Sequence, residues 1–296
     1  GKELFPTMGE LLPERIRKAI TGKDCAQIKP NMDTVVGRPP ALCAGCPHRG
    51  LFYELGKMKN TMIFSDIGCY SLGLSEPYNA TDAMICMGAS ISGGHGVAQA
   101  MKIKEENKKV ISVIGDSTFF HSGITSLMDA SYNKSSYLTV ILDNRITGMT
   151  GHQENPGSGY DLKGEPSPIV DIETVVRALD ITNVKTVNPN NLKETKEALE
   201  WGVQCEGPAV VITRWPCALK RLSTEDKEEF HDVFKTQYSV IIEKCIGCKK
   251  CLNSGCPALE YNKTGDKKMA ILQDSCLGCG VCSQICPVDA IVQKGE

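Results

Sequence analysis

The sequence has 296 residues, a formal net charge of −2 and 41% hydrophobic residues. This length suits about two domains with a buried core. The balanced charge gives no reason to expect nucleic acid or an anionic membrane as a partner. No stretch is apolar enough to span a membrane, because the best candidate, residues 83–101, contains four glycines and a histidine. No signal-peptide pattern opens the sequence, so we expect a cytoplasmic, reducing setting in which the 15 cysteines serve metal or redox chemistry.

The first 40 residues predict a short amphipathic helix at 8–20 and an extended linker at 29–40. Beyond residue 40, apolar runs alternate with helical segments. Strands are predicted at 61–65, 110–114, 137–142 and 208–213, and helices at 96–106, 124–132 and 192–201. This alternation indicates an α/β domain over 41–222, with a parallel sheet and helices on both faces. Residues 155–168 predict a loop, and 223–237 a connector that begins with a charged helix at 223–231.

Residues 238–296 hold eight of the cysteines and an internal repeat. CIGCKKCLNSGCP (245–257) recurs as CLGCGVCSQICP (276–287). The second copy is the C-x2-C-x2-C-x3-C-P run of bacterial ferredoxins, in which the fourth cysteine binds the other cluster. We therefore predict a small α+β ferredoxin-like domain with two 4Fe–4S clusters. One is held by Cys245, Cys248, Cys251 and Cys286, and the other by Cys256, Cys276, Cys279 and Cys282.

The first copy departs from the pattern, because four residues instead of three separate Cys251 from Cys256. We expect this slack to loosen ligation by Cys256. Tetrahedral zinc is the alternative, since CxxC pairs also suit that ion. Two triple-cysteine runs, each closed by Cys-Pro, favour clusters, which must also supply much of the stability of so small a module.

A second chemical signal lies after two predicted strands. Asp116 follows the strand at 110–114, and Asn144 follows the strand at 137–142. Because the carboxyl ends of parallel strands meet at one edge of the sheet, the two side chains should lie close together. With a backbone carbonyl such as that of Ile146, they offer Mg2+ three oxygen ligands and leave positions for a diphosphate. The alternative is that Asp116 only caps a helix.

The spacing of these residues resembles the thiamine-diphosphate motif, with Ser117 in place of its second Gly and Asp143 in place of its first Asn. No G-x-x-x-x-G-K-[ST] motif is present in the sequence, and the glycines at 93–96 lack dinucleotide-binding spacing.

Several motifs occur in order before the ferredoxin-like tail: RPPALCAGCPHR (38–49), SDIGCY (65–70), MGA (87–89), GDSTFFHSG (115–123) and Asp143-Asn144 through MTGHQ (149–153). From residue 37 onward the sequence resembles the C-terminal half of the large (alpha) subunit of indolepyruvate:ferredoxin oxidoreductase, in the pyruvate:ferredoxin oxidoreductase superfamily. The resemblance implies oxidative decarboxylation of an aryl 2-oxoacid to acyl-CoA and CO2, with electron transport through the clusters to an external ferredoxin.

The same resemblance implies partners: a small beta subunit, coenzyme A and an N-terminal pyrimidine-binding portion that this sequence is too short to contain, within a larger oligomer. It also implies roles for individual residues. A third 4Fe–4S cluster would be held by Cys43, Cys46, Cys69 and Cys217, although buried structural thiols are the alternative. The cofactor would contact Cys46, Pro47, His48, Gly68, Gly88, Ala89, Gly115, Asp116, Ser117, Asn144, Ile146 and Thr147.

His121 and His152 are candidates for proton transfer or substrate placement, with simple packing the alternative. Cys25, Cys86 and Cys205 match no ligand pattern and are expected to be structural. Two rival functions remain at this stage: a non-catalytic iron–sulfur electron-transfer subunit, and a flavin- or nucleotide-dependent iron–sulfur reductase.

Overall fold

The computed structural model describes residues 1–26, 31–37, 39–230, 233 and 236–295. The chain forms two compact units, residues 1–40 and 41–296. The first unit contains helix α1 (Pro13–Thr21) and a single 3-10 turn, η1 (Met32–Thr34). The predicted helix at 8–20 thus begins five residues late, because Pro13 favours the first turn of a helix. Residues 29, 30 and 38 of the predicted linker lie outside the described residues.

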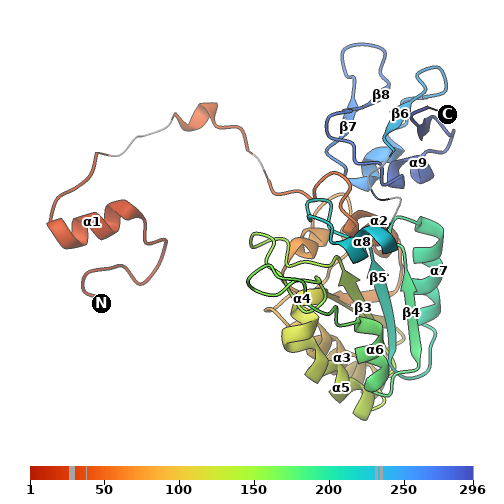
Figure 1. The fold of residues 1–296 in the computed structure, drawn as a ribbon, viewed down its shortest axis with the longest axis horizontal. Helices are drawn as coiled ribbons and strands as arrows, with labels where there is room; N and C mark the ends of the chain where they lie inside the picture. Colours follow the sequence, from red (N-terminus) through yellow and green to blue (C-terminus); the bar gives the residue numbers. More distant parts are fainter. Residues whose placement is uncertain (27–30, 38, 231–232, 234–235, 296) are drawn as a thin grey trace. The chain divides into compact units, whose positions relative to one another are not determined.

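The second unit is built on a five-stranded parallel sheet of order β1-β2-β3-β5-β4 (Figure 1). The strands are β1 (Thr61–Phe64), β2 (Lys109–Gly115), β3 (Leu138–Asp143), β4 (Asn183–Val187) and β5 (Ala209–Arg214). The central strands are almost wholly buried, which explains their unbroken Val/Ile/Leu runs. The edge strand β4 contains Asn183 and Lys185, so its polar sequence did not predict a strand.

Helices cover both faces of the sheet, as the sequence predicts. On one face Ile111 and Val113 of β2 pack with α2 (His48–Leu55) and α7 (Leu192–Gly202). On the other face Val110 and Ile114 pack with α3 (Ala89–Ile103), α5 (Ile124–Tyr132) and α6 (Ile172–Ala178). Successive residues of one strand therefore serve opposite cores, as the two-residue repeat of a strand requires.

Helix α3 begins seven residues before its predicted start and includes the glycine cluster at 93–96. A Cβ on Gly94 would lie 2.0 Å from the Ser112 hydroxyl of β2. The glycine therefore lets the helix lie close against the sheet, and this packing outweighs the low helix propensity of glycine.

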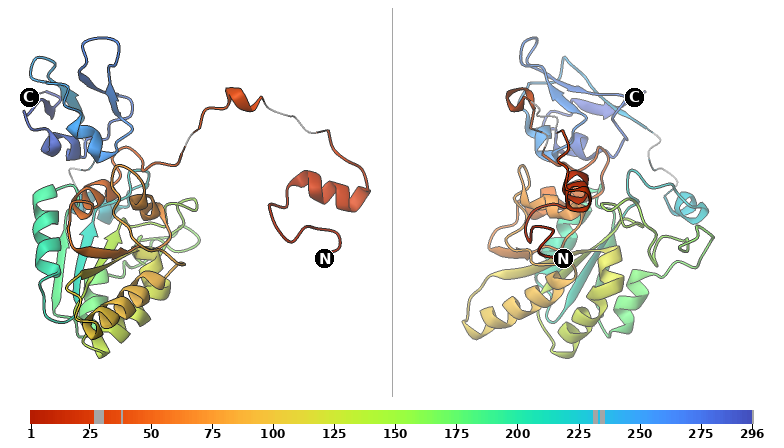
Figure 2. Two further views of the ribbon diagram at one scale, coloured as in Figure 1. Left: turned by 180° about the vertical axis from the view of Figure 1, so that it is seen from behind. Right: turned by 90° about the vertical axis from the view of Figure 1, so that its left-hand side faces the viewer.

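The cysteine-rich tail forms two small antiparallel pairs, β6 (Tyr238–Val240) with β9 (Ile291–Gln293) and β7 (Leu259–Tyr261) with β8 (Met269–Ile271). It also has a 3-10 turn, η4 (Lys250–Ser254), and helix α9 (Val281–Ile285). Contacts join η4 to α2, and Figure 2 shows the blue tail beside that part of the α/β domain. The predicted connector contains α8 (Thr224–Glu229), capped by Ser223; His231 lies outside the described residues. No helix in the described ranges has the length and apolarity needed to cross a membrane.

Candidate cofactor and metal sites

The carboxyl edge of the sheet brings Asp116 and Asn144 together. Asp116 begins the short helix α4 (Asp116–Thr118) directly after β2, and Asn144 follows β3. The backbone N–H of Ile146 donates to Asp116 Oδ2 at 3.1 Å and to Asn144 Oδ1 at 3.2 Å. Two oxygens from residues 28 positions apart thus share one amide. Asp116 does not cap α4 in the usual way, because the residue before the helix is Gly115.

Burial makes the Asp116 carboxyl a weaker acid than an exposed aspartate. The residue is 3% exposed, and burial followed by the neighbouring Asp143 raises the pKa of its carboxyl to about 7. Among the described residues no Lys, Arg or His forms an ion pair with it. A buried carboxylate without a cationic partner, beside an amide oxygen, is a donor set that fits Mg2+.

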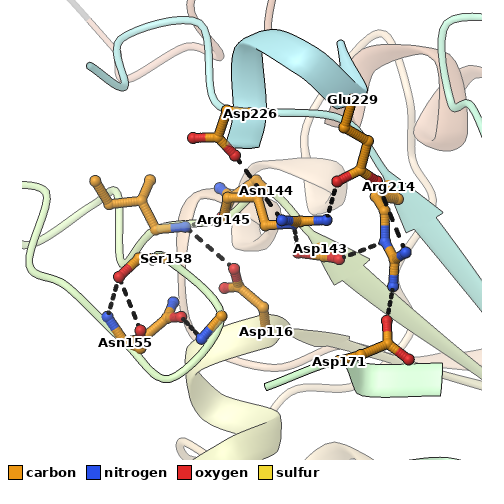
Figure 3. Close-up of polar contacts among 12 residues, drawn as sticks. Asp116, Asp143, Asn144, Arg145, Asn155, Ser158, Asp171, Arg214, Asp226 and Glu229 are labelled. Atoms are coloured by element: carbon orange, nitrogen blue, oxygen red, sulfur yellow. Dashed lines mark hydrogen bonds and ion pairs between the residues drawn. The ribbon is translucent and has the colours of Figure 1, made fainter. Parts of the chain in front are cut away.

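Asp143, which replaces the first Asn of the thiamine-diphosphate motif, has a different role. Its carboxylate accepts from Arg214 Nε at 2.8 Å and pairs with Arg145 Nε at 3.3 Å (Figure 3). The ion pairs continue from these two arginines to Asp171, Asp226 and Glu229. Asp143, the residue that departs from the motif, is thus part of an ion-pair network that compensates its charge. Asp116 is outside that network.

A cavity opens at this edge of the sheet. Of the twelve residues that the resemblance assigns to the cofactor, eight line the cavity: His48, Gly68, Gly115, Asp116, Ser117, Asn144, Ile146 and Thr147. Cys46, Pro47, Gly88 and Ala89 are not among the lining residues. Gly88 instead lies at the start of α3, where its N–H donates to Asp66 at 2.9 Å.

Only one histidine of the described residues lines the cavity, and it is neither of the two proposed for catalysis. Burial lowers the pKa of His48 to about 4, so its imidazole is neutral near pH 7. His121 is exposed, with Nδ1 2.5 Å from the Ser122 hydroxyl. His152 has a left-handed backbone, with φ of 62°, and lies outside the lining.

The structure adds lining residues to which the sequence analysis gave no role, among them Tyr70, Met87 and Met149, although each lies inside a quoted motif. The Tyr70 ring explains two motif glycines, because a Cβ on Gly68 or Gly115 would lie 2.6 or 2.4 Å from it. The position of Tyr70 directly after Cys69 inside a motif was the available signal. Asn155, from the predicted loop, also lies beside the site (Figure 3).

The eight tail cysteines divide into two groups in space. One hollow is lined by Cys245, Cys248, Cys251 and Cys286, and a second by Cys256, Cys276, Cys279 and Cys282. These are the two sets that the ferredoxin pattern predicts, including the exchange of the fourth cysteine.

Burial, then the nearby Cys286 and Cys248 thiols, raises the pKa of Cys251 to about 11. No three His, Cys, Asp or Glu side chains in the described ranges converge as for a single metal ion. Four thiols around a hollow fit a cubic cluster, in which each thiolate binds a different iron atom.

The four cysteines proposed for a third cluster come from separate segments but lie near one another. Burial raises the pKa of Cys69, and the nearby Cys217 and Cys43 thiols add to that rise; Cys46 likewise lies near Cys217 and Cys69. The Cys217 N–H donates to the Asn144 carbonyl at 3.0 Å, next to the Asp116 site. Cys69 itself lines the cavity. This set therefore adjoins the candidate cofactor site.

The extra residue before Cys256 does not leave the loop slack. Ser254 is 1% exposed, and its carbonyl accepts from the Tyr78 hydroxyl at 2.7 Å and from Arg49 Nη1 at 3.0 Å. Gly255 follows with a left-handed φ of 63°. These contacts with the α/β domain hold the loop in place; the effect on ligation by Cys256 stays a prediction.

Comparison with known proteins agrees with this architecture. Residues 66–213, half of the chain, match the C-terminal TPP-binding domain of thiamine pyrophosphate enzymes, and residues 244–290 match a 4Fe–4S dicluster domain. The chain therefore belongs to the thiamine pyrophosphate enzyme family and carries a ferredoxin-like 4Fe–4S region. Among curated proteins it is similar to the indolepyruvate oxidoreductase subunit IorA, which confirms the resemblance drawn from the motifs.

The IorA of Archaeoglobus fulgidus is 41% identical over 259 residues, which cover 86% of this chain and 40% of that protein. The IorA of Pyrococcus horikoshii is 39% identical over 321 residues, covering 100% and 49%. The chain thus spans no more than about half the length of these relatives. A solved structure, the 2-oxoglutarate:ferredoxin oxidoreductase of Magnetococcus marinus, shares the fold with a TM-score of 0.54 at 20% identity, over 68% of this chain and 74% of that chain.

Proposed function

We propose that the chain is the diphosphate-binding and electron-conducting part of a thiamine-diphosphate-dependent 2-oxoacid:ferredoxin oxidoreductase. Its substrate would be an aryl 2-oxoacid of the indolepyruvate kind, converted to acyl-CoA and CO2. The observation that carries the proposal is one juxtaposition: the Asp116–Asn144 pair opens onto a cavity that Cys69 also lines. A site for an anionic cofactor and a thiol set thus meet in one place.

Asp116, Asn144 and the Ile146 carbonyl would hold Mg2+ and, through it, the diphosphate. Thiamine diphosphate, when bound, supplies the electron sink for decarboxylation of a 2-oxoacid. Gly68 and Gly115 leave room for the Tyr70 ring, which lines the cavity. Neutral His48 offers hydrogen-bonding nitrogens without adding charge.

Another segment or subunit would complete the site. Met87 and Met149 line the cavity yet are 49% and 52% exposed. Exposed apolar side chains gathered around a pocket are typical of a surface that a partner covers. We propose that a pyrimidine-binding portion covers them and that a small beta subunit joins the complex, since the relatives are named as subunits and are about twice as long.

An electron route would lead from the cavity to the surface. Cys69 touches the cavity, and Gly45, between Cys43 and Cys46, lines the hollow of the Cys256 set. Cys251 of the Cys245 set lies near Cys282 of the Cys256 set. Cys248 of the Cys245 set is exposed, and an external ferredoxin could accept electrons there.

The proposal is tested by assaying the complete complex with a panel of 2-oxoacids, coenzyme A and a viologen acceptor. Asp116→Ala should abolish activity and lose bound thiamine diphosphate and Mg2+ while keeping its iron. Asp161→Ala, in the exposed part of the 155–168 loop, is the matched control and should keep all three. Cofactor retention by Asp116→Ala would refute the assigned site. A wild-type complex that lacks thiamine diphosphate but passes electrons would favour the non-catalytic electron-transfer subunit.

A further inference from the structure

Among the residues that the structure describes, Arg49 of α2 is a buried cation with no carboxylate partner. Its side chain is 1% exposed. Its hydrogen bonds go to neutral oxygens: Nε to the Cys43 carbonyl at 2.8 Å, Nη1 to the Tyr78 hydroxyl at 2.9 Å and the Ser254 carbonyl at 3.0 Å, and Nη2 to the Leu42 carbonyl. Burying an unpaired charge is costly, so this arrangement calls for a source of negative charge nearby.

The other buried cations among the described residues are compensated by carboxylates. Arg145 pairs with Asp143 and Glu229, and Lys220 pairs with Asp226. Arg49 stands apart from both. Its surroundings within the described ranges hold carbonyls, hydroxyls and thiols in place of carboxylates.

The groups around Arg49 belong to two cysteine sets. Its Nε donates to the Cys43 carbonyl, and its Nη1 donates to the carbonyl of Ser254, the last residue of η4 and two positions before Cys256. Burial raises the pKa of Cys279 to about 11, and the positive charge of Arg49 opposes that rise. The same charge lowers the pKa of Cys46 against the larger effect of burial. Arg49 is thus close to thiols of both sets.

The two sets also meet next to Arg49. A Cβ on Gly45 would lie 2.8 Å from the Leu277 side chain, between Cys276 and Cys279. A Cβ on Gly255 would lie 3.2 Å from Arg49 Nη1. We call the region where Gly45, Leu277, Gly255 and Arg49 meet the junction. It is closely packed, so little room remains for water to screen the guanidinium charge.

We propose that Arg49 is the counter-charge of the junction: a positioning residue that pins the turn before Cys256 and raises the reduction potential of the cluster on Cys256, Cys276, Cys279 and Cys282. This inference rests on the proposed cluster function of the chain. A 4Fe–4S cluster with four thiolates is anionic and gains one more negative charge on reduction. A fixed positive charge in a dry junction therefore favours the reduced state and draws electrons into the tail.

The test uses the full chain with its clusters loaded, titrated against redox mediators and followed by electron paramagnetic resonance. Arg49→Gln removes the charge, and Arg49→Lys keeps it but loses the planar fork. With Arg49→Gln, one midpoint potential should fall by about 59 mV, a tenfold change in a one-electron equilibrium. The other potentials should change less, and Arg49→Lys should stay near wild type. Arg177→Gln, an exposed arginine of α6, controls for net charge.

Tyr78→Phe separates packing from charge, because it removes the hydroxyl that contacts the Ser254 carbonyl and Arg49 Nη1 but keeps the guanidinium charge. It should lower the melting temperature without moving a potential. Unchanged potentials in an iron-replete Arg49→Gln variant would overturn the proposal. If Arg49→Gln fails to load iron while Arg49→Lys loads it, the positive charge is needed for the cluster and the proposal is supported; failure of both variants overturns the charge role. A wild-type chain without cluster signals would instead refute the underlying cluster function.

Discussion

At the scale of single residues, burial of Asp116 favours the neutral acid, whereas the proposed metal site needs the ionised carboxylate. A buried carboxylate beside Asp143 is unfavourable, and a divalent cation at the proposed site would offset that cost. Gly115 is constrained from the other side, because the Tyr70 ring occupies the space a side chain would need. Packing thus restricts position 115 to glycine, and burial and charge determine the acidity of its neighbour Asp116.

This opposition predicts a pH dependence. The folded-state pKa of Asp116, about 7, lies above its ordinary value of 3.8. Between those pH values the folded chain binds more protons than the unfolded chain, so stability is lost as pH rises from about 4 to 7, by up to about 4 kcal/mol.

Asp116→Asn mimics the neutral acid and removes this dependence. In protein free of Mg2+ and thiamine diphosphate, we expect its stability advantage over wild type to grow from pH 5 to pH 7 and then level off. Urea unfolding at a series of pH values measures it. If the free energies of unfolding of the two proteins changed equally with pH, the raised pKa of Asp116 would be contradicted.

At the scale of elements, α8 and the 155–168 loop are tied to the sheet edge by buried charges. Lys220 donates to the Ser158 carbonyl at 3.1 Å and pairs with Asp226 of α8, and both side chains are almost fully buried. Asp226 also closes the capping box with Ser223. One pair thus fixes the helix and the loop that approaches Asp116.

Breaking that pair should be costly. Lys220→Met leaves Asp226 buried with a weaker partner, and we expect a loss of about 3–5 kcal/mol in the free energy of unfolding. Adding Asp226→Leu should recover part of this loss, because the stranded charge is gone. Guanidinium unfolding of the single and double variants measures the coupling. Additive effects would show that the two groups do not act as a pair.

At the scale of the whole molecule, the cavity and the three cysteine sets form a series within one unit, residues 41–296. The set next to the cavity combines cysteines from the loop before α2, the segment after β1 and the segment after β5. Such a set requires the fold to form before its members meet. The tail sets depend mainly on local spacing.

Iron content tests this series. Three clusters predict about twelve iron atoms per chain, and Cys217→Ala should reduce the content to about eight. Cys205→Ala, at a thiol outside all three sets, is the matched control and should keep the full content. Iron and labile-sulfide assays on anaerobically purified protein give the counts. About eight atoms in the wild type would mean that Cys43, Cys46, Cys69 and Cys217 are structural thiols.

The sequence by itself determined the α/β class, the iron–sulfur tail and the grouping of its eight cysteines, since these follow from local periodicity and fixed spacing. It also predicted that Asp116 and Asn144 would meet, because parallel strands end at one edge.

Tertiary structure alone decided which histidine reaches the cavity, why Asp143 replaces an amide, and how the extra residue before Cys256 is held. Those features depend on burial and on contacts between distant segments, such as Arg49 with Ser254. Local patterns cannot predict such contacts, because the partners have no fixed separation along the chain.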